Sequence, residues 1–389
     1  MMSSILGTYA RKNISFKEGR GTFLYTKNGD KYLDWVAGIA TNILGHCHPY
    51  VVKAIENQSK KLIHISNAFV IPEAESLAKR LTDNTFADKV FFCNSGAESV
   101  EGSIKIIRKY FHSIGQPEKN RIISFSGAFH GRTLSALFLA NNKSHTEGFG
   151  PKVDGFDQVV FADHEELKKA IKKNTAAIIA EPIQGEGGIR VLPDYCLKGL
   201  REICDKHGIL LVLDCVQTSF RTGSLLGFEN SGISPDICCV AKGFGNGFPI
   251  GAILLTNEVS KGMSHGSHGS TFGNNLLACA ATHAVLDIVL AKGFFEDVKA
   301  KGEYFDGKLK KLKDSFPKII EEVRGINFIK GLKLKVDNND FMSKLMKHKL
   351  LVVKASENCI RLFPSLLSTT EELDMGLKII KKVCEEYKD

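Results

Sequence analysis

Lys242 has the clearest chemical use of any residue in this sequence, because of its place in the chain. It follows the apolar run 237–240, which predicts a buried strand, and open α/β sheets bind ligands at the carboxyl ends of parallel strands. A lysine partly removed from water has a lowered pKa and can form a Schiff base with a carbonyl compound. A solvated loop lysine is the ordinary alternative, since most lysines are exposed, so the neighbouring motifs must decide.

Asp214 offers a second reactive group at a predicted strand end, because it follows the apolar run 209–213. A carboxylate buried alone is unfavourable, so it needs a cationic or proton-donating partner. The protonated pyridine nitrogen of pyridoxal 5′-phosphate is one such partner, and lysine side chains hold this cofactor. A helix N-cap or a structural salt bridge is the alternative interpretation of Asp214.

A phosphate site is predicted where the strand 89–93 gives way to a helix. Free backbone N–H groups at the start of a helix bind phosphate, and Ser95 can add a hydroxyl. The same residues fit an ordinary capped helix, in which Ser95 is the N-cap and Glu98 completes a capping box. The two interpretations are compatible.

Further side chains suit a flat or anionic ligand. Phe129 could stack on a cofactor ring and Arg132 could hold a carboxylate through two hydrogen bonds, although a surface turn is the alternative. The loop 268–273 could contact a phosphate or a carboxylate, or it could be a flexible Gly/Ser loop. Arg361 lies in an apolar run and needs an anionic partner, for which a substrate carboxylate, Glu186 or a structural ion pair would serve.

The elements that position these residues are short apolar runs alternating with helical patterns, which predict an α/β fold with a parallel sheet covered on both faces. We expect a large domain over 46–285 and a smaller α+β domain over 286–389, with residues 1–45 packing against the smaller one. The predicted strands are 89–93, 121–125, 158–161, 176–180, 209–213, 236–240 and 251–255, and the predicted helices include 97–111, 165–173 and 194–207.

Composition narrows the class of protein. The chain has 389 residues, 43% of them hydrophobic, and a formal net charge of +9. Its lysines are scattered, which argues against nucleic-acid binding, and no apolar stretch is long enough for a membrane span. The ten cysteines form no C-x-x-C pair, which is typical of reduced thiols in the cytoplasm. Residues 1–17 lack acidic side chains, but they also lack the continuous apolar stretch of a secretory signal.

The order of these motifs resembles that of the class III, subgroup II aminotransferases of PLP fold type I, and most closely their bacterial members that act on acetylornithine. The resemblance implies a large domain with a mostly parallel seven-stranded sheet and a smaller α+β domain built from both termini. Because it begins at Thr8, it leaves too few preceding residues for a transit peptide, which favours the cytoplasm. The matching segments are 8–11, 45–49, 94–98, 129–133, 181–188, 241–243, 269–273 and 360–362.

The resemblance implies that the cofactor is pyridoxal 5′-phosphate and assigns its contacts. Lys242 would hold the cofactor covalently and then move a proton between substrate and cofactor, and Asp214 would hold the protonated ring nitrogen. The other implied contacts are Ser95, Gly96 and Ala97 at the phosphate, Phe129 and Val216 on the two ring faces, Gln217 at the phenolic oxygen, and Thr271 at the phosphate of the partner subunit.

The resemblance also implies an obligate homodimer with shared active sites, and it assigns the substrate contacts. Arg132 would bind a substrate carboxylate, and Ser270 would lie beside the substrate. Arg361 would bind the α-carboxylate of glutamate, and Glu186 would pair with Arg361 while the other substrate is bound. This exchange would let one pocket take a monocarboxylate amine donor and then a dicarboxylate acceptor, as ping-pong transamination requires.

Ile39 bears on the choice of substrate. Ornithine-specific relatives carry a tyrosine there, so an apolar side chain argues against a free α-ammonium group and favours an acylated one. We expect N2-acetylornithine as the amine donor and 2-oxoglutarate as the acceptor, in arginine biosynthesis. Succinylornithine, N-succinyl-diaminopimelate, ornithine and 4-aminobutyrate are the alternative donors.

The chain departs from the pattern of the family near the expected site. Cys215 stands where the family carries glutamate, Val100 replaces an asparagine, the turn 218–223 is one residue shorter, and 274–276 reads Asn-Asn-Leu. We hypothesise that Cys215 leaves cofactor binding intact but slows turnover, since loose support of a site costs activity.

Four other functions fit parts of the sequence less well. An aminomutase or decarboxylase of the same fold would need no 2-oxo acid acceptor. A nicotinamide-dependent oxidoreductase is disfavoured, because the glycines of 243–247 lack the G-x-G-x-x-G spacing. A metal site formed by 46–48 with His265 and His268 lacks a standard ligand spacing. A pure binding protein would not need a lysine and an acid at these strand ends.

Overall fold

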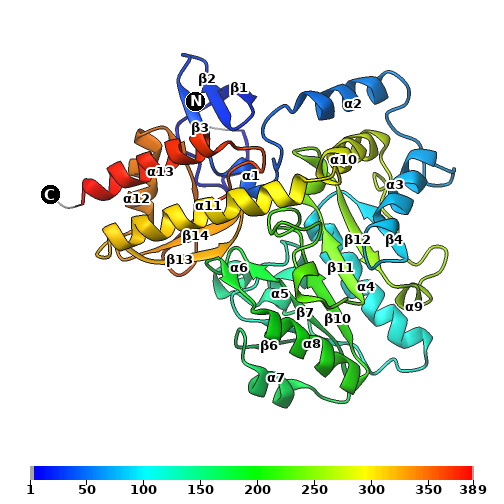
Figure 1. The fold of residues 1–389 in the computed structure, drawn as a ribbon. Coiled ribbons are helices and arrows are strands. Elements are labelled where there is room, and N and C mark those ends of the chain that lie inside the picture. Colours follow the sequence, from blue (N-terminus) through cyan, green and yellow to red (C-terminus); the bar gives the residue numbers. More distant parts are fainter. Residues whose placement is uncertain (1–3, 388–389) are drawn as a thin grey trace.

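A central seven-stranded sheet carries helices on both faces in the computed structural model, which describes residues 4–387 (Figure 1). One strand, β12, is antiparallel to both of its neighbours, and the other strands share one direction. The predicted mostly parallel seven-stranded sheet is therefore confirmed. The strands, in sheet order, are β4 (Lys89–Cys93), β12 (Gly251–Leu255), β11 (Ile237–Val240), β10 (Leu210–Asp214), β7 (Thr175–Ala180), β5 (Arg121–Phe125) and β6 (Phe156–Val159).

Both faces of this sheet are apolar, because successive residues of a strand point to opposite sides. Along β10, Leu211 packs in the core that includes α8 (Asp194–His207), and the next residue, Val212, packs in the core that includes α4 (Gly96–Ser113). Helix α5 (Leu134–Ala140) contributes to the same core as α4. The buried strands therefore form a rigid platform for the loops that follow them.

The two ends of the chain share a second sheet. Strand β15 (Leu350–Leu351) pairs in parallel with β3 (Lys31–Asp34). Strand β3 also pairs antiparallel with β2 (Phe23–Thr26), which pairs antiparallel with β1 (Phe16–Arg20). The domain boundaries at residues 45 and 285 stay predictions. Residues 1–3 and 388–389, which end the predicted terminal segments, lie outside the described residues.

A third sheet packs against the long helix α11 (Phe294–Ser315), which in turn contacts α13 (Thr370–Glu385) (Figure 1). We call this the C-terminal sheet. A short hairpin lies between the central and C-terminal sheets, since its second strand contacts the first strand of the C-terminal sheet. The C-terminal sheet has the order β13 (Ile320–Ile326), β14 (Ile329–Leu334), β17 (Cys359–Leu362) and β16 (Val353–Ala355), and the hairpin consists of β8 (Ile183–Gln184) and β9 (Arg190–Val191).

The remaining elements are mostly helical. Among residues 4–387, no single helix is both long and apolar enough to cross a bilayer, and α10 with α11 meets that criterion only as a pair bent by 72°. The other helices are α1 (Ala37–Ala40), α2 (Pro49–Ser59), α3 (Pro72–Asp83), α6 (Lys143–Thr146), α7 (His164–Ala170), α9 (Asn257–Ser260), α10 (Leu276–Val289), α12 (Asn338–Lys347) and the 3₁₀ turns η1 (Glu229–Ser231) and η2 (Lys242–Gly245).

Candidate active site

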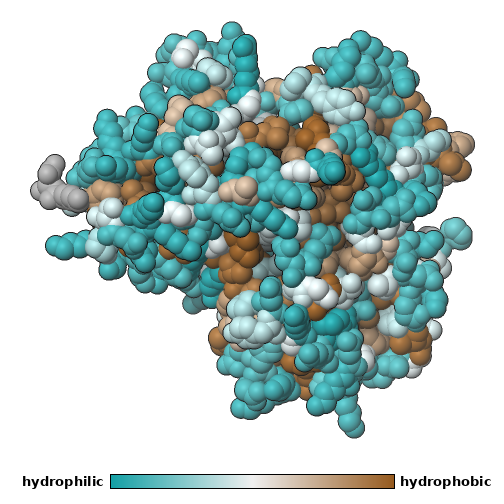
Figure 2. Space-filling model, viewed as in Figure 1, coloured by the Kyte–Doolittle hydropathy of each residue, from teal (hydrophilic) through white to brown (hydrophobic). Residues whose placement is uncertain are grey.

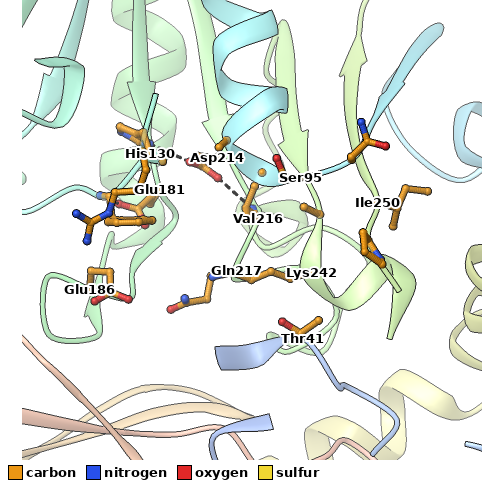
Figure 3. Close-up of a pocket in the computed structure, with 18 of the residues that line it drawn as sticks. Thr41, Ser95, His130, Glu181, Glu186, Asp214, Val216, Gln217, Lys242 and Ile250 are labelled. Atoms are coloured by element: carbon orange, nitrogen blue, oxygen red, sulfur yellow. Dashed lines mark hydrogen bonds and ion pairs between the residues drawn. The ribbon is translucent and has the colours of Figure 1, made fainter. Parts of the chain in front are cut away.

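One pocket of about 340 Å³ gathers most of the predicted site residues (Figure 3). It lies where strands of the central sheet end: Asp214 closes β10, Lys242 follows β11, and Glu181 follows β7. This edge is where open α/β sheets bind ligands. The pocket is lined by Thr41, 94–97, 129–132, Glu181, Glu186, Asp214, Val216, Gln217, Ala241, Lys242 and 247–250.

Lys242 is half-buried and starts the 3₁₀ turn η2, two residues after the end of β11. Its φ of 47° lies in the left-handed region, a conformation that costs a non-glycine residue roughly 1–3 kcal/mol and often marks a functional site. Removal from water, reinforced by the positive charge of Arg361, lowers the pKa of Lys242 to about 8. A useful fraction of the amine is therefore neutral near neutral pH, and the neutral amine is the form that attacks a carbonyl.

Asp214 and His130 form a buried pair. The Nδ1 atom of His130 lies 2.9 Å from Oδ2 of Asp214, and the N–H of Val216 donates to Oδ1 at 3.1 Å. Burial opposes the protonation of His130, but the hydrogen bond to Asp214 and its charge outweigh burial, so the pKa of His130 is raised. Two hydrogen bonds thus hold the Asp214 carboxylate in place, which suits a group that must bind a protonated ring nitrogen.

Glu181 is a further buried acid in this pocket. Its carboxylate accepts a hydrogen bond from the N–H of Phe129 at 3.0 Å. Burial raises the pKa of Glu181, although the charge of His130 partly offsets this effect. The side chains of His130, Glu181 and Asp214, which are far apart in sequence, therefore share one poorly solvated region.

The start of α4 forms the predicted anion site. Ser95 is the N-cap, because its Oγ accepts from the N–H of Glu98 at 3.2 Å. The predicted capping box is incomplete, because the Glu98 carboxylate does not accept from the N–H of Ser95. It accepts instead from the backbone N–H and the side-chain Nδ2 of Asn94, both at 2.9 Å. The N–H groups of the first turn, Gly96 and Ala97, have no acceptor within the helix and line the pocket, so they can bind a phosphate.

Several features fit a flat cofactor with a hydroxyl group. Phe129 and Val216 both line the pocket, and Val216 lies close enough to the backbone of Gly96 that a Cβ there would be 2.7 Å from Cγ1. Within residues 4–387, the buried Oε1 of Gln217 has no hydrogen-bond partner. A buried amide without a partner is unfavourable, so a ligand group is expected to satisfy it. The residues present therefore fit pyridoxal 5′-phosphate.

Two arginines offer separate carboxylate sites. Arg361, which is 2% exposed, donates from Nη1 to Glu186 Oε1 at 2.5 Å and from Nη2 to the carbonyl of Lys354 at 2.8 Å. Arg132 is exposed at the pocket wall, where its Nη2 lies 3.3 Å from Nε2 of His145. Arg361 is thus already paired with the Glu186 carboxylate, whereas Arg132 is exposed to solvent.

Ser270 and Thr271 lie outside this pocket in the single chain. Thr271 is exposed, and the Oγ of Ser270 accepts from Asn94 Nδ2 at 3.1 Å and from the N–H of Gly273 at 3.1 Å. Their loop therefore contacts the segment that precedes α4, without reaching Lys242 of the same chain.

The pocket residues that the sequence did not identify include His130, Glu181 and Thr41. His130 and Glu181 stood inside motifs chosen for their neighbours, and only the folded chain brings them to Asp214. Thr41 lies two residues after Ile39, whose φ of 58° is unusual for a β-branched residue. That backbone signal cannot be seen in the sequence.

Comparison with known proteins agrees with this chemistry. Residues 8–384 match the family described as Aminotransferase class-III. The acetylornithine aminotransferase of Agrobacterium fabrum is 50% identical over 374 residues, which cover 96% of this chain and 94% of that protein. The acetylornithine aminotransferase of Clostridium acetobutylicum is 42% identical over 98% of each chain.

Solved structures of aminotransferases share the fold. The ornithine aminotransferase of Toxoplasma gondii gives a TM-score of 0.95 at 29% identity, covering 99% of this chain and 93% of that one. The acetylornithine aminotransferase of Elizabethkingia anophelis gives 0.87 at 30% identity, covering 98% and 96%. The protein therefore belongs to the class-III aminotransferases, a family of enzymes that depend on pyridoxal 5′-phosphate.

Proposed function

We propose that this aminotransferase moves the terminal amino group of N2-acetyl-L-ornithine to 2-oxoglutarate. The products are N-acetyl-L-glutamate 5-semialdehyde and L-glutamate, and the reaction serves arginine biosynthesis. Relatives named acetylornithine aminotransferase, 42–50% identical across nearly the whole chain, support this proposal. The observation that carries it is the ion pair between the buried Arg361 and Glu186, because Glu186 lines the same pocket as Lys242.

Backbone and apolar groups hold the cofactor in this proposal. The N–H groups of Gly96 and Ala97 and the hydroxyl of Ser95 bind the phosphate, aided by the positive end of the α4 dipole. Phe129 and Val216 take the two faces of the ring. When bound, the cofactor supplies an electron sink that makes the C–H bond of the substrate amine acidic.

Polar groups hold and move protons. Asp214, fixed by His130, keeps a proton on the ring nitrogen, and Gln217 binds the phenolic oxygen. Lys242 would hold the cofactor through Nζ and, once released, its amine would move a proton to or from the substrate carbon. The lowered pKa of Lys242, about 8, supports this role, because a general base works best near the operating pH.

The arginines select the substrates. Arg132 binds the carboxylate of acetylornithine while Glu186 keeps Arg361 neutralised. When 2-oxoglutarate or glutamate enters, its α-carboxylate replaces Glu186 on Arg361, and Arg132 takes the second carboxylate. The partly exposed side chain of Glu186 (35%) supports this exchange, since it has room to move, whereas Arg361 is fixed by its burial. One pocket thereby serves both halves of a ping-pong reaction.

We also propose that the enzyme is a homodimer in which Thr271 reaches the phosphate of the partner subunit and Ser270 lies beside its substrate. The position of both residues outside their own pocket supports this arrangement. Apolar residues are exposed between α2 and α3 and beside Thr271, and Figure 2 shows hydrophobic surface in the region of α3. The exposed residues are Leu62, Ile63, Phe69, Val70 and Phe272.

We infer a cytoplasmic location from the cysteines. All ten are free, and nine of them are buried. Buried thiols without disulfides are typical of a reducing compartment.

Glutamate formation from acetylornithine and 2-oxoglutarate tests the proposal. The purified protein, loaded with pyridoxal 5′-phosphate, should give a kcat/KM for acetylornithine at least about tenfold above those for ornithine and 4-aminobutyrate, because a buried polar mismatch discriminates strongly. Succinylornithine and N-succinyl-diaminopimelate belong in the same series. A preference for ornithine, or product formation that needs no 2-oxo acid, would overturn the proposal.

A further inference from the structure

The hairpin β8–β9 carries Glu186 in its turn and is tied to the central sheet by Arg190. The Nε of Arg190 donates to Oε1 of Gln184 at 3.1 Å, and its Nη2 donates to the carbonyl of Ser126. The guanidinium also lies 4.4 Å from the ring centre of Phe161. Ser126 stands just before the segment that holds Phe129 and His130, so Arg190 joins the hairpin to the cofactor side of the pocket.

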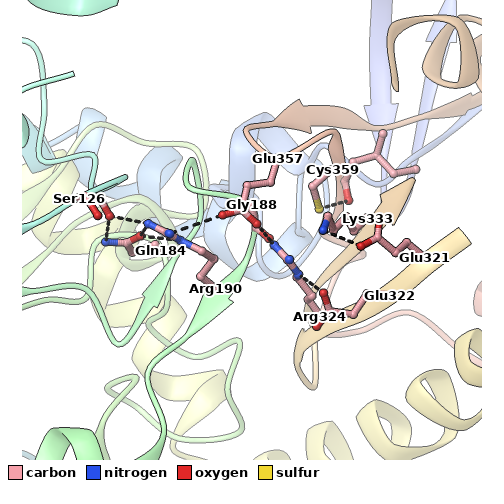
Figure 4. Close-up of polar contacts among 11 residues, drawn as sticks. Ser126, Gln184, Gly188, Arg190, Glu321, Glu322, Arg324, Lys333, Glu357 and Cys359 are labelled. Atoms are coloured by element: carbon pink, nitrogen blue, oxygen red, sulfur yellow. Dashed lines mark hydrogen bonds and ion pairs between the residues drawn. The ribbon is translucent and has the colours of Figure 1, made fainter. Parts of the chain in front are cut away.

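The opposite side of the hairpin is tied to the C-terminal sheet by Arg324 (Figure 4). The Nη1 of Arg324 donates to the carbonyl of Gly188 at 3.0 Å and to Oε2 of Glu357 at 2.6 Å. The N–H of Ser356 donates to the backbone carbonyl of Glu186 at 2.9 Å. The turn that contains Ser356 and Glu357 leads into β17, which bears Arg361.

Glu357 connects the two arginines. Its Oε2 accepts from Arg324, and its Oε1 accepts from Nη1 of Arg190 at 3.4 Å. One carboxylate therefore bridges a residue of the hairpin and a residue of the C-terminal sheet. We call Arg190, Glu357 and Arg324 the hairpin bridge.

The backbone of the turn has little free space. A Cβ on Gly188 would lie 3.0 Å from the carbonyl oxygen of Ser356 and 3.2 Å from Nη1 of Arg324. A Cβ on Gly187 would lie 2.8 Å from the carbonyl oxygen of Gly127. The main chain beside Glu186 is thus enclosed from both sides, while the Glu186 side chain stays partly exposed.

We propose that the hairpin bridge sets substrate selectivity by fixing the main chain at Glu186, so that only its side chain moves on and off Arg361. Arg190, Glu357 and Arg324 are positioning residues in this role, since they act through Glu186 and touch no substrate. This inference rests on the proposed function. A loosened hairpin would weaken the pairing of Glu186 with Arg361 and so harm the half-reaction that needs Arg361 neutralised.

The matched variants are Glu357→Gln and Glu321→Gln. Glu357→Gln removes the negative charge that lies between the two arginines of the hairpin bridge. Glu321→Gln removes the negative charge of an acid in the same region, which pairs with Lys333 at 2.6 Å. Single-turnover absorbance changes of the holoenzyme measure the acetylornithine and glutamate half-reactions separately. We expect Glu357→Gln to lower the acetylornithine-to-glutamate ratio of kcat/KM roughly fivefold, in keeping with the modest strength of partly exposed ion pairs. Glu321→Gln should leave the ratio unchanged.

A second readout does not depend on activity. Hydrogen exchange of the amides in 185–188 should speed up in Glu357→Gln and stay at the wild-type rate in Glu321→Gln. Should Glu357→Gln fail to fold, Arg324→Met replaces it, because methionine keeps an extended side chain but cannot donate to Gly188 or Glu357. Arg324→Met should shift the ratio in the same direction.

The outcomes separate this inference from the proposed function. Equal losses in both half-reactions, or unchanged hydrogen exchange at 185–188, would overturn the inference while leaving the transaminase assignment intact. A wild-type enzyme that does not use acetylornithine would overturn the proposed function, and the hydrogen-exchange comparison would still decide whether the bridge fixes the hairpin.

Discussion

His130 and Asp214 lie 2.9 Å apart, Nδ1 to Oδ2, with each side chain almost wholly removed from solvent. One residue follows β5 and the other ends β10, so the sheet brings together groups that are 84 positions apart. The second nitrogen of His130, Nε2, has no partner among residues 4–387. Asp214 thus owes part of its orientation to His130, a residue that the sheet brings to it from a distant part of the chain.

Replacing His130 with leucine should slow the reaction and leave the fold intact. The variant loses a hydrogen bond to a charged acceptor, for which we expect roughly a tenfold fall in kcat. Asparagine, which can still donate to Asp214, should recover part of the loss. A leucine variant with the kcat of the wild type would show that His130 does not support Asp214.

The pKa of Lys242 predicts how cofactor uptake depends on pH. Only the neutral amine attacks a carbonyl, so uptake by the apo enzyme should speed up as pH rises to about 8 and then level off. Arg361→Met removes a positive charge that lowers this pKa, so its profile should move to higher pH. Lys333→Met, which removes a charge paired with Glu321, serves as the control. A shift of the Arg361→Met profile to lower pH would contradict the assignment.

Gly96→Ala should weaken cofactor binding. The new methyl group would lie 2.7 Å from Cγ1 of Val216, so the start of α4 or Val216 must shift. We expect roughly a tenfold rise in the Kd of the cofactor, comparable to the loss of one charge-assisted hydrogen bond.

Adding Val216→Ala to that variant should restore part of the binding by making room for the methyl group. Gly307→Ala is a matched control within α11, where a Cβ meets nothing within 4 Å. That change should stabilise the fold by roughly 0.5–1 kcal/mol and leave the Kd unchanged. Full binding by Gly96→Ala alone would argue against phosphate binding at this helix start.

Cys215 is fully buried beside Asp214, and the hypothesis that it slows turnover stays a prediction. Cys215→Glu should raise kcat while lowering Tm, because a buried carboxylate costs stability unless it finds a partner. Cys215→Ser tests the effect of size and polarity without a charge. A large loss of kcat in a folded Cys215→Glu enzyme would count against the hypothesis.

The strands and the main chemistry could be predicted from sequence because they depend on local patterns. Lys242 and Asp214 each follow an apolar run, and β4, β5 and β12 have the predicted bounds. The edge strand β6 begins and ends two residues before the predicted range 158–161. In the fold, Asp157 pairs with Arg121 of the neighbouring strand at 2.7 Å, which a local pattern cannot reveal.

The contacts that hold the site residues in place could not be predicted either, because they also join residues far apart in the chain. Asp214 meets His130, and Glu186 meets Arg361, across separations of 84 and 175 residues. The sequence suggested Glu186 as one partner of Arg361 but gave no sign that Glu357 would hold the hairpin. Such contacts arise from the arrangement of sheets, and only the structure defines them.

The most direct test is to reduce the purified enzyme with borohydride and locate the cofactor on its peptides. We expect a single pyridoxyl group on the peptide that contains Lys242, loss of the near-visible absorbance band, and an inactive Lys242→Ala variant. A Lys242→Ala enzyme that exchanges amino groups at the wild-type rate, or a pyridoxyl group on another lysine, would contradict the proposed role of Lys242.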